Sequence, residues 1–184
     1  FEDAAIGIVV YSFMGSDGGG GFATRGARIA RNVISGAVYG LYVIDSGTNV
    51  FERNELKDNA AAVFDIRVFA PEDIANIYED NRIVRSSSYG FVAWGTSPVL
   101  RGNDFRHNGV GPEIPSADLE PLPTLLGHRR GGIAIIPFAG SGNDVLDDGD
   151  PANDFVGDPV IGEPRSPNEF HGNGDFDLYA LDER

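Results

Sequence analysis

Short apolar runs separated by polar turns recur along the chain. Typical runs open on a small residue and continue with large apolar ones, as in Gly40-Leu41-Tyr42-Val43-Ile44 and Gly90-Phe91-Val92-Ala93-Trp94. They are too short for helices and rich in β-branched and aromatic residues, so they predict strands. Six such runs can be identified, at residues 7–11, 40–44, 62–66, 90–94, 132–136 and 177–181.

A second phrase recurs between the strands: an asparagine, any residue, a large apolar residue, two further residues and an asparagine. It is complete at 54–59, 103–108 and 168–173, and degenerate copies begin at Asn32 and Asn81. Asparagine suits a turn because it tolerates left-handed backbone, and amides stacked in register can bond one another from coil to coil. The spacings from Asn32 to Asn54 and from Asn81 to Asn103 are both 22 residues. A coil of that length predicts parallel pairing of equivalent strands, with loop insertions in the longer intervals.

Together, the two phrases resemble the right-handed parallel β-helix repeat of the pectate-lyase-like and NosD-like superfamily, over roughly residues 6–182. The resemblance implies an all-β, right-handed parallel β-helix (a solenoid) of about six coils. An ordinary β-sandwich is the rival fold, but it gives no reason for the asparagine phrase to return with matched strands behind it.

We expect one β-helix domain over residues 1–184, interrupted by loop insertions at 15–26 and 109–131 and by an acidic loop at 140–165. The chain opens at Phe1 with neither Met nor a signal peptide. We therefore expect it to be a fragment or processed part of a longer chain.

Successive side chains of a strand point to opposite faces, so aligning the six runs sorts their residues into columns. The inward column reads Ile8, Leu41, Val63, Phe91, Ile133 and Leu178. The first outward column reads Val9, Tyr42, Phe64, Val92, Ala134 and Tyr179, and the second reads Tyr11, Ile44, Ile66, Trp94, Ile136 and Leu181. Neither outward column contains a charge. Strands that are apolar on both faces are usually covered on both, so we expect the outward face to be covered.

One residue interrupts this pattern. Asp65 lies within a strand, and the alignment points it inward. Buried there, it needs a partner such as Arg67 or a neighbouring amide. A misassigned register or a bulge in that coil is the alternative interpretation.

The apolar outward face indicates association with protein: a symmetry mate, another subunit or another part of the same chain. We predict that it binds through six residues, Tyr11, Tyr42, Phe64, Trp94, Ile136 and Tyr179. A saccharide platform is the competing hypothesis, since Tyr and Trp rings offer flat faces with polar tips. The columns supply almost none of the hydrogen-bonding side chains that such a platform needs.

Composition narrows the partners. The formal charge is −14, from 28 Asp and Glu against 14 Lys and Arg, which disfavours nucleic acid and anionic membrane surfaces. No apolar run approaches the roughly 20 residues that span a bilayer, so we expect no membrane insertion. The absence of cysteine excludes disulfides and thiolate metal sites. An acidic, lysine-poor composition fits an extracellular, cell-surface or periplasmic protein, and equally a GC-rich genome.

The resemblance also implies an alternative function, that of a polysaccharide lyase or hydrolase. In polysaccharide lyases an Arg or Lys can act as the base, and the dense basic cluster here is His128-Arg129-Arg130, which His107 could join. An internal ion pair or a docking patch is the simpler interpretation. His171 occupies the turn position equivalent to His107, which favours a repeated structural role for both. The spacing shows no Ser-His-Asp arrangement, zinc-protease motif or dinucleotide-binding motif.

Acidic residues cluster after residue 140 with no Lys or Arg among them. Residues 140–146 resemble one copy of the glycine-aspartate nonapeptide of calcium-binding β-rolls, although that family needs tandem copies. Calcium takes six to eight oxygen ligands, which this segment can supply. The candidate ligands are Asp144, Asp147, Asp148 and Asp150. A calcium-stabilised glycan-binding module is therefore a third hypothesis, and a solvated acidic loop is the alternative interpretation of this segment.

Overall fold

The computed structural model describes residues 5–11, 25–66, 75–110, 129–136, 160–162 and 164–180. All regular secondary structure within these ranges is β-strand, and they contain no helix long and apolar enough to cross a membrane. The predicted insertions and the predicted acidic loop lie largely outside the described residues.

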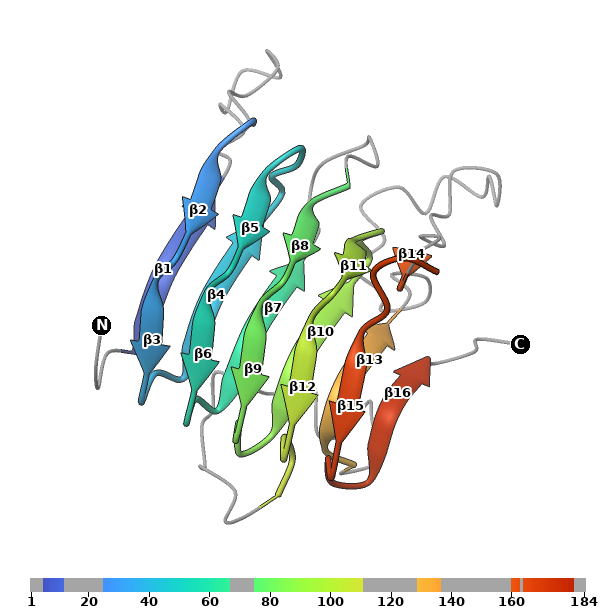
Figure 1. Ribbon diagram of the computed structural model, residues 1–184. Helices are drawn as coiled ribbons and strands as arrows, with labels where there is room; N and C mark the ends of the chain where they lie inside the picture. The colour runs from blue at the N-terminus through green and yellow to red at the C-terminus, as the bar shows by residue number, and fades with distance from the viewer. Residues whose placement is uncertain are drawn as a thin grey trace, which may run out of the picture.

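Within the described ranges, sixteen strands form three parallel sheets that the chain visits in turn (Figure 1). Sheet I has the order β1 (Ile6–Tyr11), β4 (Tyr39–Ile44), β7 (Ala61–Ile66), β10 (Tyr89–Trp94), β13 (Gly131–Ile136) and β16 (Phe176–Ala180). Sheet II has the order β2 (Arg28–Ala30), β5 (Val50–Glu52), β8 (Ile77–Glu79), β11 (Val99–Arg101) and β14 (Val160–Ile161). Sheet III has the order β3 (Val33–Ser35), β6 (Glu55–Lys57), β9 (Arg82–Val84), β12 (Asp104–Arg106) and β15 (Glu169–His171). This is the predicted right-handed parallel β-helix.

The interior is a column of apolar side chains, one set per coil. The predicted inward column is confirmed, since Ile8, Leu41, Val63, Phe91, Ile133 and Leu178 face one another through the six strands of sheet I. Sheets II and III contribute the opposite walls, where aromatic rings stack from coil to coil. Phe51 lies 4.7 Å from Tyr78 and Phe105 lies 5.3 Å from Phe170, centroid to centroid. The core therefore runs along the whole stack.

The predicted asparagine ladder is present between sheets II and III. Oδ1 of Asn54 accepts the backbone N–H and the Nδ2–H of Asn32, at 3.0 and 3.1 Å. The same pair of bonds links Asn54 to Asn81, Asn81 to Asn103 and Asn103 to Asn168. Each amide also donates to a strand carbonyl beside it, as Asn81 does to Phe51 at 2.8 Å. The ladder thus satisfies buried polar groups in every coil.

The conformational reason given for asparagine was wrong. The residue before four of the five ladder positions has positive φ, as in Arg53 (52°) before Asn54 and Asp80 (53°) before Asn81, whereas the asparagines do not. The same holds at the corner after sheet III, where Asp58 (56°) precedes Asn59. Asparagine is therefore needed for the reach of its amide, not for its backbone freedom.

A further asparagine column, formed by Asn49 and Asn76, lies just before the strands of sheet II. It was not predicted, because no repeated phrase marks it. The next coil has Pro98 at the equivalent position, and proline has no side-chain oxygen to accept these bonds. Asp65 takes over the acceptor role. Its carboxylate accepts Asn76 Nδ2–H at 3.2 Å and the Tyr78 hydroxyl at 2.7 Å.

Asp65 is buried and points inward as the alignment predicted, in unbroken register between Val43 and Ala93. The alternatives of a wrong register or a bulge are incorrect, and the suggested partner Arg67 lies outside the described residues. Burial, followed by the neighbouring Asp65 carboxylate, raises the pKa of Tyr78 well above its usual value. The phenol therefore stays protonated and donates to the acid.

Candidate functional site

The outward face of sheet I carries a second apolar cluster, separate from the interior core. Both predicted outward columns are confirmed in register from β1 to β13, and the first continues to β16. A further column, from Ile6 and Tyr39 through Tyr89 to Phe176, also contributes to this cluster and was not predicted. Simple alternation fails there because Gly40 and Leu41 both face the interior. We call this surface the outer face.

Aromatic side chains contact one another along the outer face. Tyr39 and Tyr42 stack with their ring centroids 4.8 Å apart, and Phe64 lies 5.3 and 5.5 Å from these two rings. Trp94 meets Phe64 edge-on at 6.3 Å. Such pairs fix the rings in place, which gives the outer face a defined shape.

Exposure changes along the outer face from one end of the stack to the other. Val92 and Ala134 in the middle are 0% exposed within the single chain, before any partner is added. Val9 and Tyr11 on β1 are 50% and 47% exposed. These central outward residues are therefore already buried within the single chain, and the described outer-face residues that are exposed lie on β1.

The structure places the described basic candidates in different surroundings. The Arg129 guanidinium lies 5.4 Å from the centre of the Tyr179 ring, while Arg130 donates to the carbonyl of Ser87 at 3.2 Å. His107 Nδ1 lies 3.4 Å from the Gly172 carbonyl oxygen. No contact among these three side chains is found in the described part of the chain, so they do not form one site there. His128 and the predicted calcium ligands Asp144, Asp147, Asp148 and Asp150 lie outside the described residues.

His171 is not the counterpart of His107, contrary to the sequence interpretation. His171 lies on β15 opposite Arg106 of β12, and the turn residue aligned with His107 is Gly172. The prediction of a repeated structural histidine is therefore wrong. In the six-residue phrase, His107 is the fifth residue and lies in the turn, whereas His171 is the fourth residue and lies on the strand.

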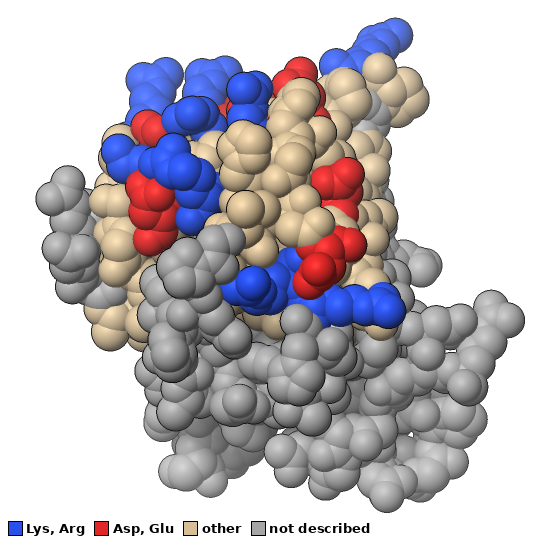
Figure 2. Space-filling model, turned by 90° about the horizontal axis from the view of Figure 1, so that it is seen from below, with Lys and Arg blue, Asp and Glu red and all other residues tan. Residues whose placement is uncertain are grey.

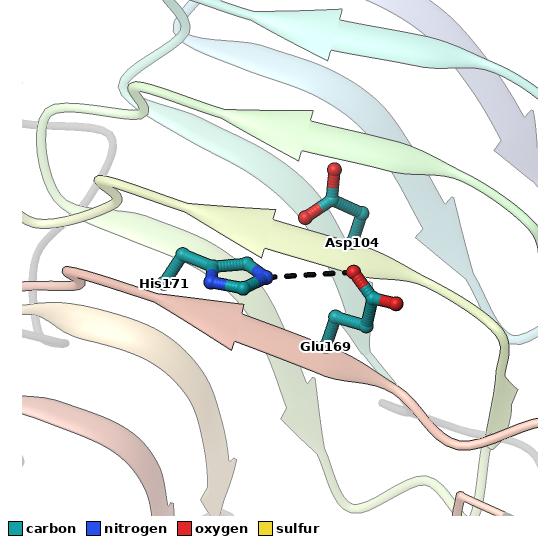
Figure 3. A group of neighbouring side chains, drawn as sticks. All are labelled: Asp104, Glu169 and His171. Carbon is teal, nitrogen blue, oxygen red and sulfur yellow. Dashed lines mark hydrogen bonds and ion pairs between the residues drawn. The ribbon is translucent and has the colours of Figure 1, made fainter.

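A polar cluster that the sequence did not reveal lies on the outside of sheet III (Figure 3). One ligand atom each of Asp104, Glu169 and His171 lies within 4.8 Å of the others. His171 Nε2 lies 3.4 Å from Glu169 Oε2, and Asp104 projects from the neighbouring strand. The signal was present in the repeat, because an acid follows the first asparagine at both 104 and 169.

A cation already occupies this cluster. Arg106 Nε donates to Asp104 Oδ1 at 2.6 Å, and its Nη2 lies 3.8 Å from Glu169 Oε2. The carboxylates raise the pKa of Arg106. A metal ion here would sit against a fixed guanidinium charge, so we interpret the cluster as a surface ion-pair network between two coils.

One comparison with known proteins bears on these coils. A family model described as a right-handed β-helix region matches residues 7–113. The chain belongs to this right-handed β-helix family. The match covers β2 to β12, including most of the asparagine ladder and the exposed end of the outer face. No curated protein and no solved structure matches the chain.

Charges on the β-helix coils are balanced. The described ranges hold 12 of the 14 Lys and Arg but only 11 of the 28 Asp and Glu. Blue and red side chains lie beside one another in the view from below (Figure 2). The acidic excess of this β-helix protein therefore belongs to segments outside the described coils.

Ion pairs link successive coils of the β-helix. Arg85 binds Asp58 through two bonds of 2.7 and 2.6 Å, and Arg101 binds Glu79 at 2.8 Å. The hydrogen bonds from Arg85 hold the pKa of Asp58 below its usual value. We therefore interpret Arg85 and Arg101 as structural residues that connect adjacent coils.

Proposed function

We propose that this β-helix is an association module that acts outside the cytoplasm, and that its outer face binds a second copy of the chain at β1. The observation that carries the proposal is the exposure of Val9 and Tyr11, 50% and 47%, at the end of an apolar cluster whose members are buried or partly buried. Isolated exposed apolar residues are common, but these two continue a contiguous cluster across β4 and β7.

A second copy is favoured because the described residues at this end of the outer face are apolar or tyrosine and carry no charge. Val9 lies next to Tyr42 and Tyr11 next to Ile44 in the sheet register. An uncharged patch is self-complementary, so two copies can meet about a two-fold axis and present the same residues to each other. A partner of opposite charge would find nothing to recognise there.

A polysaccharide lyase or hydrolase is the second candidate. It is favoured by the gathering of Asp104, Arg106, Glu169 and His171 on one exposed strand face. Turnover of a panel of neutral and acidic polysaccharides, lost on Glu169→Gln, would establish it. Arg129→Ala provides a second test, because Arg129 was the base candidate from sequence and lies elsewhere, beside Tyr179.

Sedimentation velocity over a range of concentrations tests the association. We expect the wild-type chain to sediment as a dimer at concentrations where Val9→Lys is a monomer, because a charge would be buried in an apolar contact. Val33→Lys is the matched control, since Val33 is also 50% exposed in the first coil but lies on sheet III. A wild-type chain that remains monomeric, or equal behaviour of the two variants, would contradict the proposal.

A further inference from the structure

A second column of asparagines lies at the corner between sheet III and sheet I. Asn108 Oδ1 accepts the backbone N–H of Ser86 at 3.0 Å, and Asn173 Oδ1 accepts that of Asn108 at 2.9 Å. Asn59 Oδ1 accepts the backbone N–H of Ala37 at 3.0 Å in the same way. Each of these bonds joins one coil to the next. The column is interrupted at one position, where the residue that follows Asn59 in the column is Ser86.

Buried polar groups lack a partner at this interruption, among the residues that the structure describes. Asn59 and Ser86 are both 0% exposed. The Ser86 hydroxyl has no hydrogen-bond partner, and no oxygen accepts the backbone N–H of Asn59. The hydroxyl of the adjacent Ser87 is also buried without a partner. The two coils therefore lack the buried amide bond that joins the other coils at this corner. We call Asn59, Ser86 and Ser87 the serine gap.

The neighbouring strands of sheet I show why an asparagine does not close the serine gap. Besides a carbonyl oxygen, an added Cβ at Gly40 would meet Nδ2 of Asn59 at 3.2 Å, and one at Gly90 would meet Nδ2 of Asn108 at 3.1 Å. Each amide thus packs against a glycine. In the coil between these two glycines, the same strand position is Ala62. Its methyl group occupies the corresponding space, so the shorter side chain of serine fits where an amide does not.

A surface ion pair spans the serine gap. Asp58 directly precedes Asn59, and Arg85 directly precedes Ser86. Arg85 donates two hydrogen bonds to the Asp58 carboxylate, at 2.7 and 2.6 Å. The two side chains are 52% and 49% exposed, so salt screens their attraction. The coils on either side have a histidine and a glycine at this corner position, so this ion pair belongs to the coils that lack the amide bond.

We propose that the serine gap is a charge-controlled opening point of the β-helix, at which the pair of Arg85 and Asp58 holds two coils together. Weakening this ion pair opens the corner, while the rest of the stack stays closed. Buried amide bonds join the other coils at this corner and respond little to salt, whereas an exposed ion pair loses strength as the ionic strength rises. Local opening of this kind occurs where few buried interactions oppose it.

Hydrogen exchange of single amides tests the proposal. The Ser87 N–H donates to the Asn59 carbonyl across the serine gap at 2.8 Å, and the Ala60 N–H donates to the Ala37 carbonyl at 2.9 Å at the same corner between the two preceding coils. We expect Ser87 to exchange faster than Ala60 after correction for intrinsic rates. Raising the salt from about 0.05 M to about 0.5 M should accelerate Ser87 about threefold and leave Ala60 unchanged. Asp58→Asn should accelerate Ser87 equally at low salt and remove its response to salt.

Glu55→Gln is the matched control. It breaks the ion pair between Glu55 and Arg82, which joins the same two coils on the same sheet. That pair lies beside the intact amide bonds from Asn54 to Asn81. The exchange rate of Ser87 should therefore stay at its wild-type value in Glu55→Gln.

Closing the serine gap is the converse test. The double variant Ala62→Gly with Ser86→Asn restores the glycine and the amide of the other coils. In it Ser87 should exchange more slowly than in the wild type, and Asp58→Asn should no longer accelerate it.

Two results would overturn the proposal without use of the double variant. One is a Ser87 amide as slow as that of Ala60 at both salt concentrations. The other is equal acceleration of Ser87 by Asp58→Asn and Glu55→Gln. Both are measured on the wild type or on charge-neutralising surface variants, so a misfolded double variant does not affect the outcome. The proposal is independent of the association through the outer face.

Discussion

Truncating an asparagine in the middle of the ladder tests what these residues do. Asn81→Ala removes the Oδ1 that accepts two bonds from Asn54 and the Nδ2–H that Phe51 accepts. Three buried groups then lose a partner: the backbone N–H and Nδ2–H of Asn54 and the carbonyl of Phe51. A buried polar group left without a partner costs about 1–3 kcal/mol. We therefore expect the free energy of unfolding to fall by about 3 kcal/mol or more.

The first member of the same ladder is the control. Asn32→Ala removes the bonds from Asn32 Nδ2 to Ala30 and Asn54, but Asn54 Oδ1 still accepts the backbone N–H of Asn32. The site is also half-buried, so water can solvate what remains. We expect a loss of about 1 kcal/mol or less. Urea unfolding of the two variants and the wild type measures both values. Equal losses would refute the ladder and assign asparagine a purely local role in its turn.

Three further predictions concern the core and the acidic segment. Asp65→Ala removes the carboxylate that accepts from Asn76 Nδ2–H and the Tyr78 hydroxyl, and should lower the free energy of unfolding by about 3 kcal/mol. Asp65→Asn keeps one acceptor oxygen and should lower it by less. Urea unfolding of the two variants measures the difference. Because the pKa of Tyr78 is raised, the stabilising contribution of its protonated phenol is complete below pH 10 and declines as the pH rises above 10. An absorbance titration should therefore find this phenol un-ionised until the chain unfolds. Tyr78→Phe should lessen the loss of stability at alkaline pH. Calcium binding by residues 144–150 predicts that a chelator lowers the melting temperature, and an unchanged value would remove the metal.

The fold could be predicted because its determinants are local and repeated. The spacing from Asn32 to Asn54 sets the length of a coil, and the small residue that opens most strand runs sets the register of sheet I. Both follow from the stacking of one unit on the next. The inward position of Asp65 followed from the same alignment, although its partners Asn76 and Tyr78 did not, because they belong to another sheet.

What the sequence could not provide depends on departures from simple periodicity. Gly40 and Leu41 face inward together, so period-two alternation gives no sign that Tyr39 faces outward, and the outward column to which it belongs was not predicted. His171 and His107 differ by one place in the phrase, which is enough to put one on a strand and the other in a turn.

Which strands of the outer face are buried within the chain could not be predicted either. It depends on how much of the chain covers each strand, and periodicity carries no information on that. Val92 and Val9 occupy the same column, yet one is fully buried and the other half-exposed.

Cross-linking through single introduced cysteines tests the proposed association most directly, because the chain has no cysteine of its own. The account predicts that mild oxidation of Val9→Cys gives a disulfide-linked dimer, since the two copies of this residue meet across the contact. Val33→Cys, equally exposed on the neighbouring sheet, should remain monomeric under the same conditions. Dimer yields that are equal for the two variants, or negligible for Val9→Cys, would contradict an association through the outer face at β1.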